Sequence, residues 1–192
     1  MKRRKFIFTA ALSFPFLAFS KKMKLPELPL PAEEINPQEG FVIKAGKNRF
    51  NETTKLGGLS PVDIKVSTSD TNGMLSISEY TGYTKGGPPL HIHPHEDEIF
   101  IILEGEHLFQ VGDKRYYLSA GDTIFLPRNV PHAPCQLSEK GRYLYFFTPA
   151  GKIEDFFREV DKLEVTGQPT PEMMADIFTR HGMIIVGPPL EY

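Results

Sequence analysis

The sequence predicts one domain built on an all-β barrel or sandwich. Short β-rich segments recur between turn residues from Pro61 to Thr148, and such spacing is typical of sandwiches and barrels. The 16 Gly and 17 Pro residues supply many turns, while 15 Phe and 7 Tyr residues offer bulky side chains for a core. A length of 192 residues fits a single domain with a substantial core.

Charge and cysteine content narrow the choice of partners. The formal net charge is −2, and residues 1–20 hold four of the 22 basic residues and no acid, which leaves 18 basic against 24 acidic residues, or −6. Such a surface repels phosphate backbones, and no basic stripe is visible, so we expect no nucleic-acid partner. The lone cysteine, Cys135, excludes an intrachain disulfide, and we interpret it as a small buried hydrophobe.

Residues 1–20 are predicted to be a signal peptide. A basic cap from Met1 to Lys5 precedes an apolar stretch, and Ala18-Phe19-Ser20 offers small residues for cleavage. The apolar stretch is shorter than the roughly 20 residues that a transmembrane helix needs. We therefore expect a bacterial protein exported to the periplasm or secreted, with no stable membrane span after maturation.

The basic cap also suggests a route of export. The segment Arg3-Arg4-Lys5-Phe6-Ile7 resembles the twin-arginine pattern, although Lys2 stands where Ser or Thr is usual, so general secretion stays the alternative. Residues 21–40 are rich in Pro and Lys without a sustained period, which predicts a linker or extended arm.

The barrel is expected within residues 41–150. Seven strands are predicted, at residues 62–66, 74–80, 99–103, 107–111, 115–118, 123–126 and 143–147. The run 99–103 is apolar without alternation, which predicts that both of its faces are covered, by a second sheet or by another subunit. On this ground we expect a homodimer.

Residues 151–192 are predicted to form a helical extension. Apolar residues there recur at intervals of three and four, the pattern of an amphipathic helix, at Ile153, Phe156, Phe157, Val160 and Leu163. A second helix is expected to begin with Thr170 as N-cap and Pro171 at N1, and to end at Gly182. Its apolar residues are expected in the core or in a lid.

Two histidines and a glutamate form the most informative stretch. His91 and His93 are two residues apart, so in a strand both imidazoles point into the barrel interior. Glu98 lies an odd number of positions beyond His93 and would face outward on an unbroken strand. Pro94 and the polar residues after it favour a turn or bulge that returns Glu98 to the interior.

A third histidine follows a separate turn and strand. Residues 121–131 form a glycine turn, a short strand and a Pro-rich corner that delivers His132. Three neutral imidazoles and a carboxylate suit Fe, Mn, Co, Ni, Cu or Zn, whereas Ca and Mg prefer oxygen ligands. We therefore predict one divalent transition metal held by His91, His93, Glu98 and His132, whose identity the order of affinities does not settle.

These residues resemble the two motifs of the cupin superfamily, G(x)5HxH(x)3-4E(x)6G and G(x)5PxG(x)2H(x)3N. The matching positions are His91, His93, Glu98 and Gly105 in the first motif, and Gly121, Pro127 and His132 in the second. The departures are Lys85, Asn129 and Gln136, which stand where the motifs have Gly, Gly and Asn. Asn tolerates the left-handed conformation of the corner. The resemblance implies a jelly-roll barrel, the cupin double-stranded β-helix.

The chain further resembles single-domain cupins of the quercetin 2,3-dioxygenase type. The shared features are the Gly86-Gly87-Pro88-Pro89-Leu90-His91 opening, the acidic segment 96–98, the segments 146–151 and 156–159, and the closing Gly187-Pro188-Pro189. The resemblance implies an enzyme whose metal binds an enediol or enolate small molecule and then engages dioxygen, with Glu98 as the catalytic proton acceptor. The alternatives are a metal-holding module that binds a small molecule without turnover, and a sugar isomerase or epimerase.

The remaining polar and aromatic residues receive less specific interpretations. His95 is an alternative ligand, but the spacing favours an exposed turn. Glu96 and Asp97 are expected to be solvated charges, or to shape the entrance of the site, and His107 and His181 are expected on the surface or in the core. The strand aromatics are expected to pack, with one or two of them forming a substrate wall: Tyr80, Phe100, Tyr143, Tyr145 and Phe147.

The twin-arginine hypothesis makes a direct prediction. Replacing Arg3 and Arg4 together by Lys keeps the basic cap but removes the paired arginines, so the unprocessed precursor should accumulate in the cytoplasm. Immunoblots of fractionated cells measure this. Unchanged export would favour general secretion.

Overall fold

The computed structural model describes residues 39–167 and 169–192. The predicted signal peptide, residues 1–20, and most of the predicted arm lie outside the described residues. Among the described helices, none has the length and apolar character needed to cross a bilayer.

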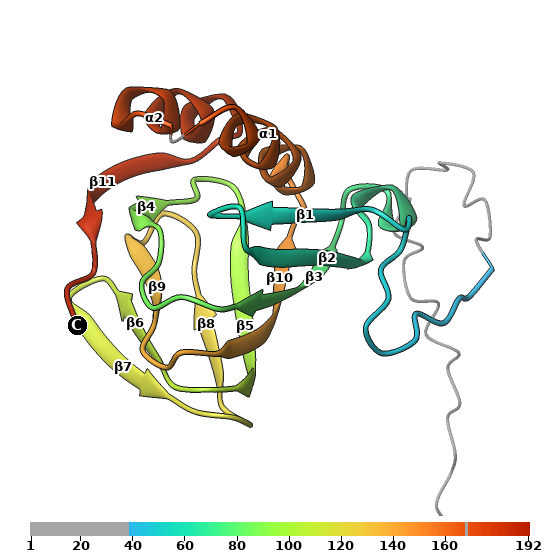
Figure 1. Cartoon of the computed structure of the whole chain (residues 1–192), viewed down its shortest axis with the longest axis horizontal. Coiled ribbons are helices and arrows are strands. Elements are labelled where there is room, and N and C mark those ends of the chain that lie inside the picture. Colours follow the sequence, from blue (N-terminus) through green and yellow to red (C-terminus); the bar gives the residue numbers. More distant parts are fainter. Residues whose placement is uncertain (1–38, 168) are drawn as a thin grey trace, which may run out of the picture. The chain divides into compact units, whose positions relative to one another are not determined.

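Two antiparallel sheets form the body of the domain (Figure 1). The six-stranded sheet has the order β1 (Thr53–Leu56), β2 (Ser60–Val66), β3 (Ser76–Gly82), β10 (Gly141–Thr148), β5 (Asp97–Glu104), β8 (Thr123–Leu126). The five-stranded sheet has the order β11 (Ile184–Pro189), β4 (Pro89–Ile92), β9 (His132–Gln136), β6 (His107–Val111), β7 (Lys114–Leu118). A short 3-10 helix, η1 (Thr68–Thr71), and the helices α1 (Ile153–Thr166) and α2 (Pro171–Arg180) complete it. The predicted all-β fold with two C-terminal helices is confirmed.

All seven predicted strands are present, and the described residues form four more: β1, β4, β9 and β11. Strand β4 carries His91, which was expected in a strand whose bounds were not predicted. Prolines in β9 and β11 argue against strands there, because a proline lacks the amide that a ladder uses. The pairing of β4 with β9 is correspondingly short, with His91 opposite His132 as its one paired position.

The two sheets share one apolar interior. Phe100 of the six-stranded sheet and Phe109 of the five-stranded sheet meet edge to face, with ring centroids 4.8 Å apart. Other inward-facing strand residues join them in the same cluster: Val62, Ile102, Ile124, Leu126, Tyr145 and Phe147. Burying one such side chain contributes about 1.5–3 kcal/mol. A smaller cluster on the outer side of β9 includes Cys135, which is buried as predicted.

Strand β5 is covered on one of its two faces. Phe100 and Ile102 point into the interior and are buried, which the second sheet explains. Ile99 and Ile101 on the outer face are half-buried, and Leu103 is exposed. Described residues leave part of this outer face open, so the homodimer stays a prediction.

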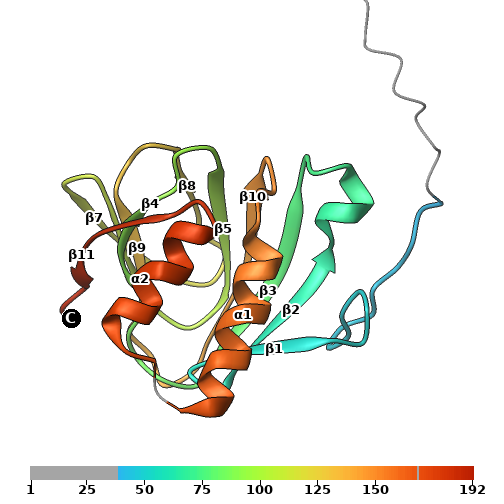
Figure 2. The same cartoon turned by 90° about the horizontal axis from the view of Figure 1, so that it is seen from above.

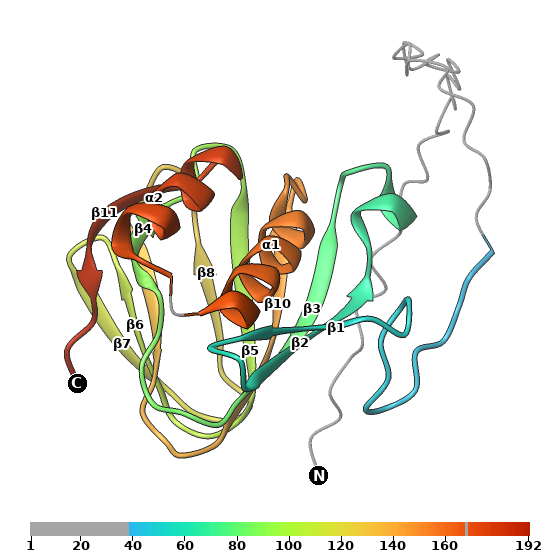
Figure 3. The same cartoon turned by 45° about the horizontal axis from the view of Figure 1, so that its top comes forward.

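Both helices are present, but the predicted helical extension is wrong at its end, because α2 ends at Arg180 and Ile184–Pro189 form β11 of the five-stranded sheet. Ile153, Phe156, Phe157 and Val160 of α1 are buried, while Leu163 packs at the edge of the same cluster. The Thr170 hydroxyl accepts a hydrogen bond from the backbone N–H of Met173 at 3.3 Å and so caps α2. Figures 2 and 3 show α1 beside β1 and α2 beside β11, and these elements are in contact.

A buried carboxylate fixes the beginning of α1. Glu154 Oε1 accepts hydrogen bonds from the backbone N–H of Thr68 (2.6 Å), the Thr68 hydroxyl (2.9 Å) and the Ser76 hydroxyl (3.1 Å). Its Oε2 accepts from the Ser67 hydroxyl at 2.9 Å. One side chain thereby ties α1 to η1 and to β3.

Removing this carboxylate should destabilise the domain. Glu154→Leu leaves several buried donors without an acceptor, and we expect a loss of about 3 kcal/mol in the free energy of unfolding. The adjacent Asp155→Leu is the control, because the Asp155 side chain is 71% exposed and its loss should cost less than about 1 kcal/mol. Urea denaturation of both variants measures the difference, and equal losses would contradict the role of Glu154.

Candidate metal centre

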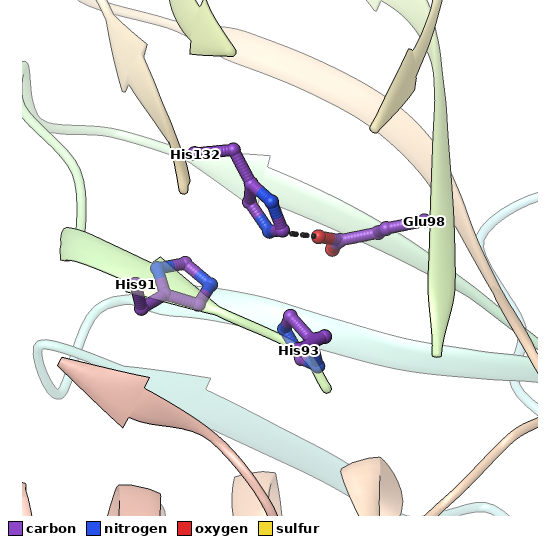
Figure 4. Close-up of side chains that lie close together, drawn as sticks. All are labelled: His91, His93, Glu98 and His132. Carbon is purple, nitrogen blue, oxygen red and sulfur yellow. Dashed lines mark ion pairs between the residues drawn. The ribbon is translucent and has the colours of Figure 1, made fainter. Parts of the chain in front are cut away.

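Four buried side chains point toward one another inside the barrel. His91 lies on β4, His93 directly after it, Glu98 on β5 and His132 on β9. Their exposed fractions are 5%, 3%, 5% and 0%. One potential ligand atom from each lies within 4.8 Å of the others, and Figure 4 shows the side chains turned to a common point. The structure thus brings together the four predicted ligands, a set that is able to hold a metal.

Backbone carbonyls determine which nitrogen of two histidines faces the centre. His91 Nδ1 is 2.8 Å from the carbonyl oxygen of Pro89, and His132 Nδ1 is 2.9 Å from that of Val130. A carbonyl can only accept, so each Nδ1 carries a proton and donates it. When such an imidazole is neutral, its Nε2 presents a lone pair.

The donor atoms fit a cation. Glu98 Oε2 lies 3.2 Å from His132 Nε2, and both atoms are buried without a hydrogen-bond partner among the described residues. With His132 Nδ1 protonated, two lone-pair atoms face each other at this distance, an arrangement that a shared proton or a metal ion stabilises. Three imidazoles and one carboxylate are a usual ligand set for divalent transition metals.

Electrostatics favour the metal-binding forms of two of these groups. Burial, together with the neighbouring His132 and His93, lowers the pKa of His91 to about 3, so this imidazole is neutral near pH 7. Burial alone would raise the pKa of Glu98, but its contact with His132 and the nearby histidines outweigh burial and lower it. The site therefore offers a neutral imidazole and an ionised carboxylate.

The backbone places the side chains of Glu98 and His132 in the barrel interior, as the sequence predicts. Strand β4 ends at Ile92 and β5 begins at Asp97, so the intervening turn resets the alternation and places Glu98 inside. At the Pro-rich corner Asn129 adopts the left-handed conformation, with φ of 64°, which Asn tolerates. The backbone N–H of Asn129 donates to the carbonyl oxygen of His93 at 2.9 Å, which joins the two ligand-bearing loops.

The expectation of a solvated charge is wrong for Glu96, whereas Asp97 is partly exposed and forms an ion pair. Asp97 accepts from the Arg128 side chain (2.7 Å) and from its backbone N–H (2.8 Å), a second link between the two loops. Glu96 is only 8% exposed. His95, between the turn proline and Glu96, is exposed as expected.

Glu96 is a buried neighbour of His93. Its Oε2 is 3.6 Å from His93 Nδ1 and is buried without a hydrogen-bond partner among the described residues. Gly151 has φ of 56°, and a Cβ there would overlap Glu96 Oε1, so the turn before α1 packs directly on this carboxylate. Burial alone would raise the pKa of Glu96. The nearby His93 outweighs burial, so the pKa of Glu96 is lowered. Sequence reasoning missed this contact.

Three of the four candidate ligands, His91, His93 and Glu98, line a cavity of about 400 Å³. All five strand aromatics named above line it, more than the one or two expected, and α1 and α2 close it with Phe156, Phe157, Met174 and Phe178. Tyr80 and Tyr143 stack with ring centroids 4.7 Å apart. A cavity of this size, mostly apolar with a few polar groups, is typical of small-molecule sites.

Comparisons with known proteins agree with this arrangement. A family model described as "Cupin domain" matches residues 83–147. Oxalate oxidase GF-3.8 of Triticum aestivum is 28% identical over 104 residues, which are 49% of this chain and 46% of that protein. Quercetin 2,3-dioxygenase of Bacillus subtilis is 23% identical over 128 residues, 67% of this chain and 35% of that protein. The chain thus spans less than half of either enzyme.

Two further relatives match over most of their own length. The uncharacterized protein YdbB of Bacillus subtilis is 33% identical over 86 residues, which are 41% of this chain and 74% of that protein. The crystal structure of an RmlC-like cupin from Shewanella frigidimarina superposes with a TM-score of 0.50 and 23% identity, covering 61% of this chain and 96% of that one. The structural match supports the fold alone.

The contact between Glu96 and His93 predicts an effect on metal affinity. Glu96→Gln replaces an anion 3.6 Å from His93 Nδ1 by a neutral amide, and we expect the dissociation constant for Co(II) to rise about 10- to 100-fold. Titration of the metal-free protein, followed by the visible absorption of bound Co(II), measures this. The control is His95→Gln at the neighbouring exposed position, and equal affinities in both variants would contradict the role of Glu96.

Proposed function

Because this chain belongs to the cupin superfamily, we propose that it is a metal-dependent dioxygenase of the quercetinase type, acting on an aromatic or enediol small molecule. The observation that carries the proposal is the convergence of His91, His93, Glu98 and His132, the first three of which line an aromatic-walled cavity. The metal is a divalent transition ion, one of Fe, Mn, Co, Ni, Cu or Zn. It would supply Lewis acidity and a template for substrate and oxygen.

The cavity walls orient a flat substrate and exclude water. Phe100, Tyr145 and Phe147 line the cavity from the sheet, and residues of α1 and α2 line it from the helical side. Their rings favour stacked or edge contacts with a planar molecule. Since water is displaced from such a site, a charge inside it interacts more strongly with its neighbours.

Glu98 is placed to act as a general base. Its carboxylate is buried and borders the cavity. One carboxylate oxygen is sufficient to hold a metal, so the other is free to accept the proton of a substrate hydroxyl. A lowered pKa keeps the carboxyl ionised and therefore able to accept that proton.

The named relatives support oxygen chemistry over the other two functions. One relative is an oxidase and another a dioxygenase by name. Binding without turnover and sugar isomerisation require no dioxygen, so consumption of dioxygen separates them from the proposed reaction.

Replacing the base should separate metal binding from turnover. Glu98→Gln keeps the three imidazoles, and we expect partial metal binding with turnover lowered at least 100-fold. The assay is oxygen uptake with a flavonol, after elemental analysis of the protein purified from its native compartment. Glu104→Gln is the control, since this carboxylate also lies on β5 but is exposed and pairs with Lys140.

Two results would contradict the proposal. Unchanged turnover of Glu98→Gln would remove Glu98 as the base. A redox-inactive native metal together with no oxygen uptake would remove the dioxygenase function.

A further inference from the structure

The strand that carries His91 depends on β11 for most of its pairing. Strand β4 has a single paired position with β9, where His91 is opposite His132. On its other edge β4 pairs with β11 at three positions, and at one of them Ile185 is opposite His91. Figure 1 shows β11 beside β4. A segment from the C-terminal end of the chain therefore supports the backbone of a candidate ligand.

The ring of Phe178 on α2 contacts the ring of His91. The two rings meet edge to face, with centroids 5.5 Å apart and planes at 81°. Phe178 is 2% exposed and lines the cavity together with His91. The hydrogen bond from His91 Nδ1 to the Pro89 carbonyl fixes one edge of the imidazole, but a single bond leaves the ring free to rotate about it. Phe178 limits that rotation, because a close-packed ring leaves no room on its side.

Glu159 on α1 anchors the C-terminal end of α2. Its Oε1 is 2.7 Å from Arg180 Nη2, and its Oε2 is 2.7 Å from His181 Nε2. These two partners lower the pKa of Glu159 to about 2, so its carboxylate is ionised near pH 7. The His181 ring also packs on Phe156, which contacts Phe178 edge to face with centroids 5.0 Å apart. Glu159 thereby fixes the end of the helix that carries Phe178.

The elements that make these contacts follow the part of the chain that the cupin family model matches. The match ends at residue 147, whereas α1, α2 and β11 lie between Ile153 and Pro189. The two cupin motifs account for the four candidate ligands, but they contain none of the residues that hold His91 from the C-terminal side. The support of this ligand is therefore a property of the C-terminal segment of this chain.

We propose that Phe178 is a positioning residue for the metal ligand His91, and that Glu159 acts on the metal centre through Phe178. A neighbour that holds a ligand in its binding orientation reduces the ordering that metal binding requires, and so raises the affinity for the metal. The inference rests on the candidate metal centre and goes beyond the proposed reaction, since it requires neither dioxygen nor a substrate.

Removing the Phe178 ring should weaken the metal site. Phe178→Ala leaves a space beside His91, and we expect the dissociation constant for Co(II) to rise about tenfold. At saturating Co(II) the visible spectrum of the bound ion should also change, because it depends on how the ligands are arranged, and a loss of folding stability alone would not change it. Phe178→Leu keeps most of the apolar volume and should restore part of both. Titration of the metal-free full chain with Co(II) measures affinity and spectrum together.

Ile177→Ala is the matched control for lost packing. Ile177 precedes Phe178 on α2, is 3% exposed and belongs to the same apolar cluster, but the described residues that line the cavity do not include it. Its truncation should destabilise the metal-free protein about as much as Phe178→Ala does, as urea denaturation measures. The affinity for Co(II) and the spectrum of bound Co(II) should stay close to those of the wild type.

A double-mutant cycle tests whether Glu159 acts through Phe178. Glu159→Gln removes the charge that holds Arg180 and His181, and we expect the dissociation constant for Co(II) to rise about threefold. Combined with Phe178→Ala, it should weaken Co(II) binding no further than Phe178→Ala does alone, because the contact through which it acts is already lost. Glu172→Gln, at an exposed carboxylate in the first turn of α2, is the control and should bind Co(II) as the wild type does.

Several outcomes would overturn the inference. These are failure of the wild type to bind Co(II), wild-type affinity and spectrum in Phe178→Ala, and equal weakening by Ile177→Ala. Additive effects of Glu159→Gln and Phe178→Ala would remove the role of Glu159. A weakened Co(II) site in Phe178→Ala without oxygen uptake on any metal form would remove the dioxygenase proposal and leave Phe178 in its role, whereas oxygen uptake with unchanged Co(II) affinity would do the reverse.

Discussion

The candidate metal centre depends on buried nitrogen and oxygen atoms whose lone pairs face one another. Glu98 Oε2 and His132 Nε2 are 3.2 Å apart without another partner among the described residues. Backbone carbonyls hold the Nδ1 protons of His91 and His132, so the orientation of both rings is set by the chain itself. Acceptor atoms arranged in this way repel one another unless a cation lies between them. The surrounding structure therefore has to hold the four side chains in place before any metal arrives.

The barrel holds them through short links between two loops. The loop after β4 carries His93, and the corner before β9 leads to His132. The Asn129 backbone N–H donates to the His93 carbonyl, and Arg128 forms an ion pair with Asp97 at 2.7 Å. Around this frame the aromatic side chains of the sheets and of the helices leave a cavity instead of filling the interior. The fold thus joins a preorganised ligand set to a site for a small molecule.

Local signals predicted much of this structure. Alternation and glycine turns identified the seven regular strands, and the three- and four-residue period and Thr170 identified the helices. The spacing of His91, His93, Glu98 and His132, together with its resemblance to the cupin motifs, identified the four converging side chains. The signals failed where tertiary contacts decide. The prolines of β9 and β11 led to these two strands being missed, because a proline in a strand normally argues against one. Glu96 was expected to be a solvated acid. Its burial depends on Gly151, which lies 55 positions away in the sequence and packs on it only after folding.

The most direct test of the account is a crystal structure of the protein with its native metal, with diffraction recorded on both sides of the absorption edge of that metal. We predict one anomalous peak, with the Nε2 atoms of His91, His93 and His132 and a carboxylate oxygen of Glu98 at bonding distances of about 2.0–2.3 Å. A metal found elsewhere, or a metal-free protein with these side chains turned apart, would contradict the central claim.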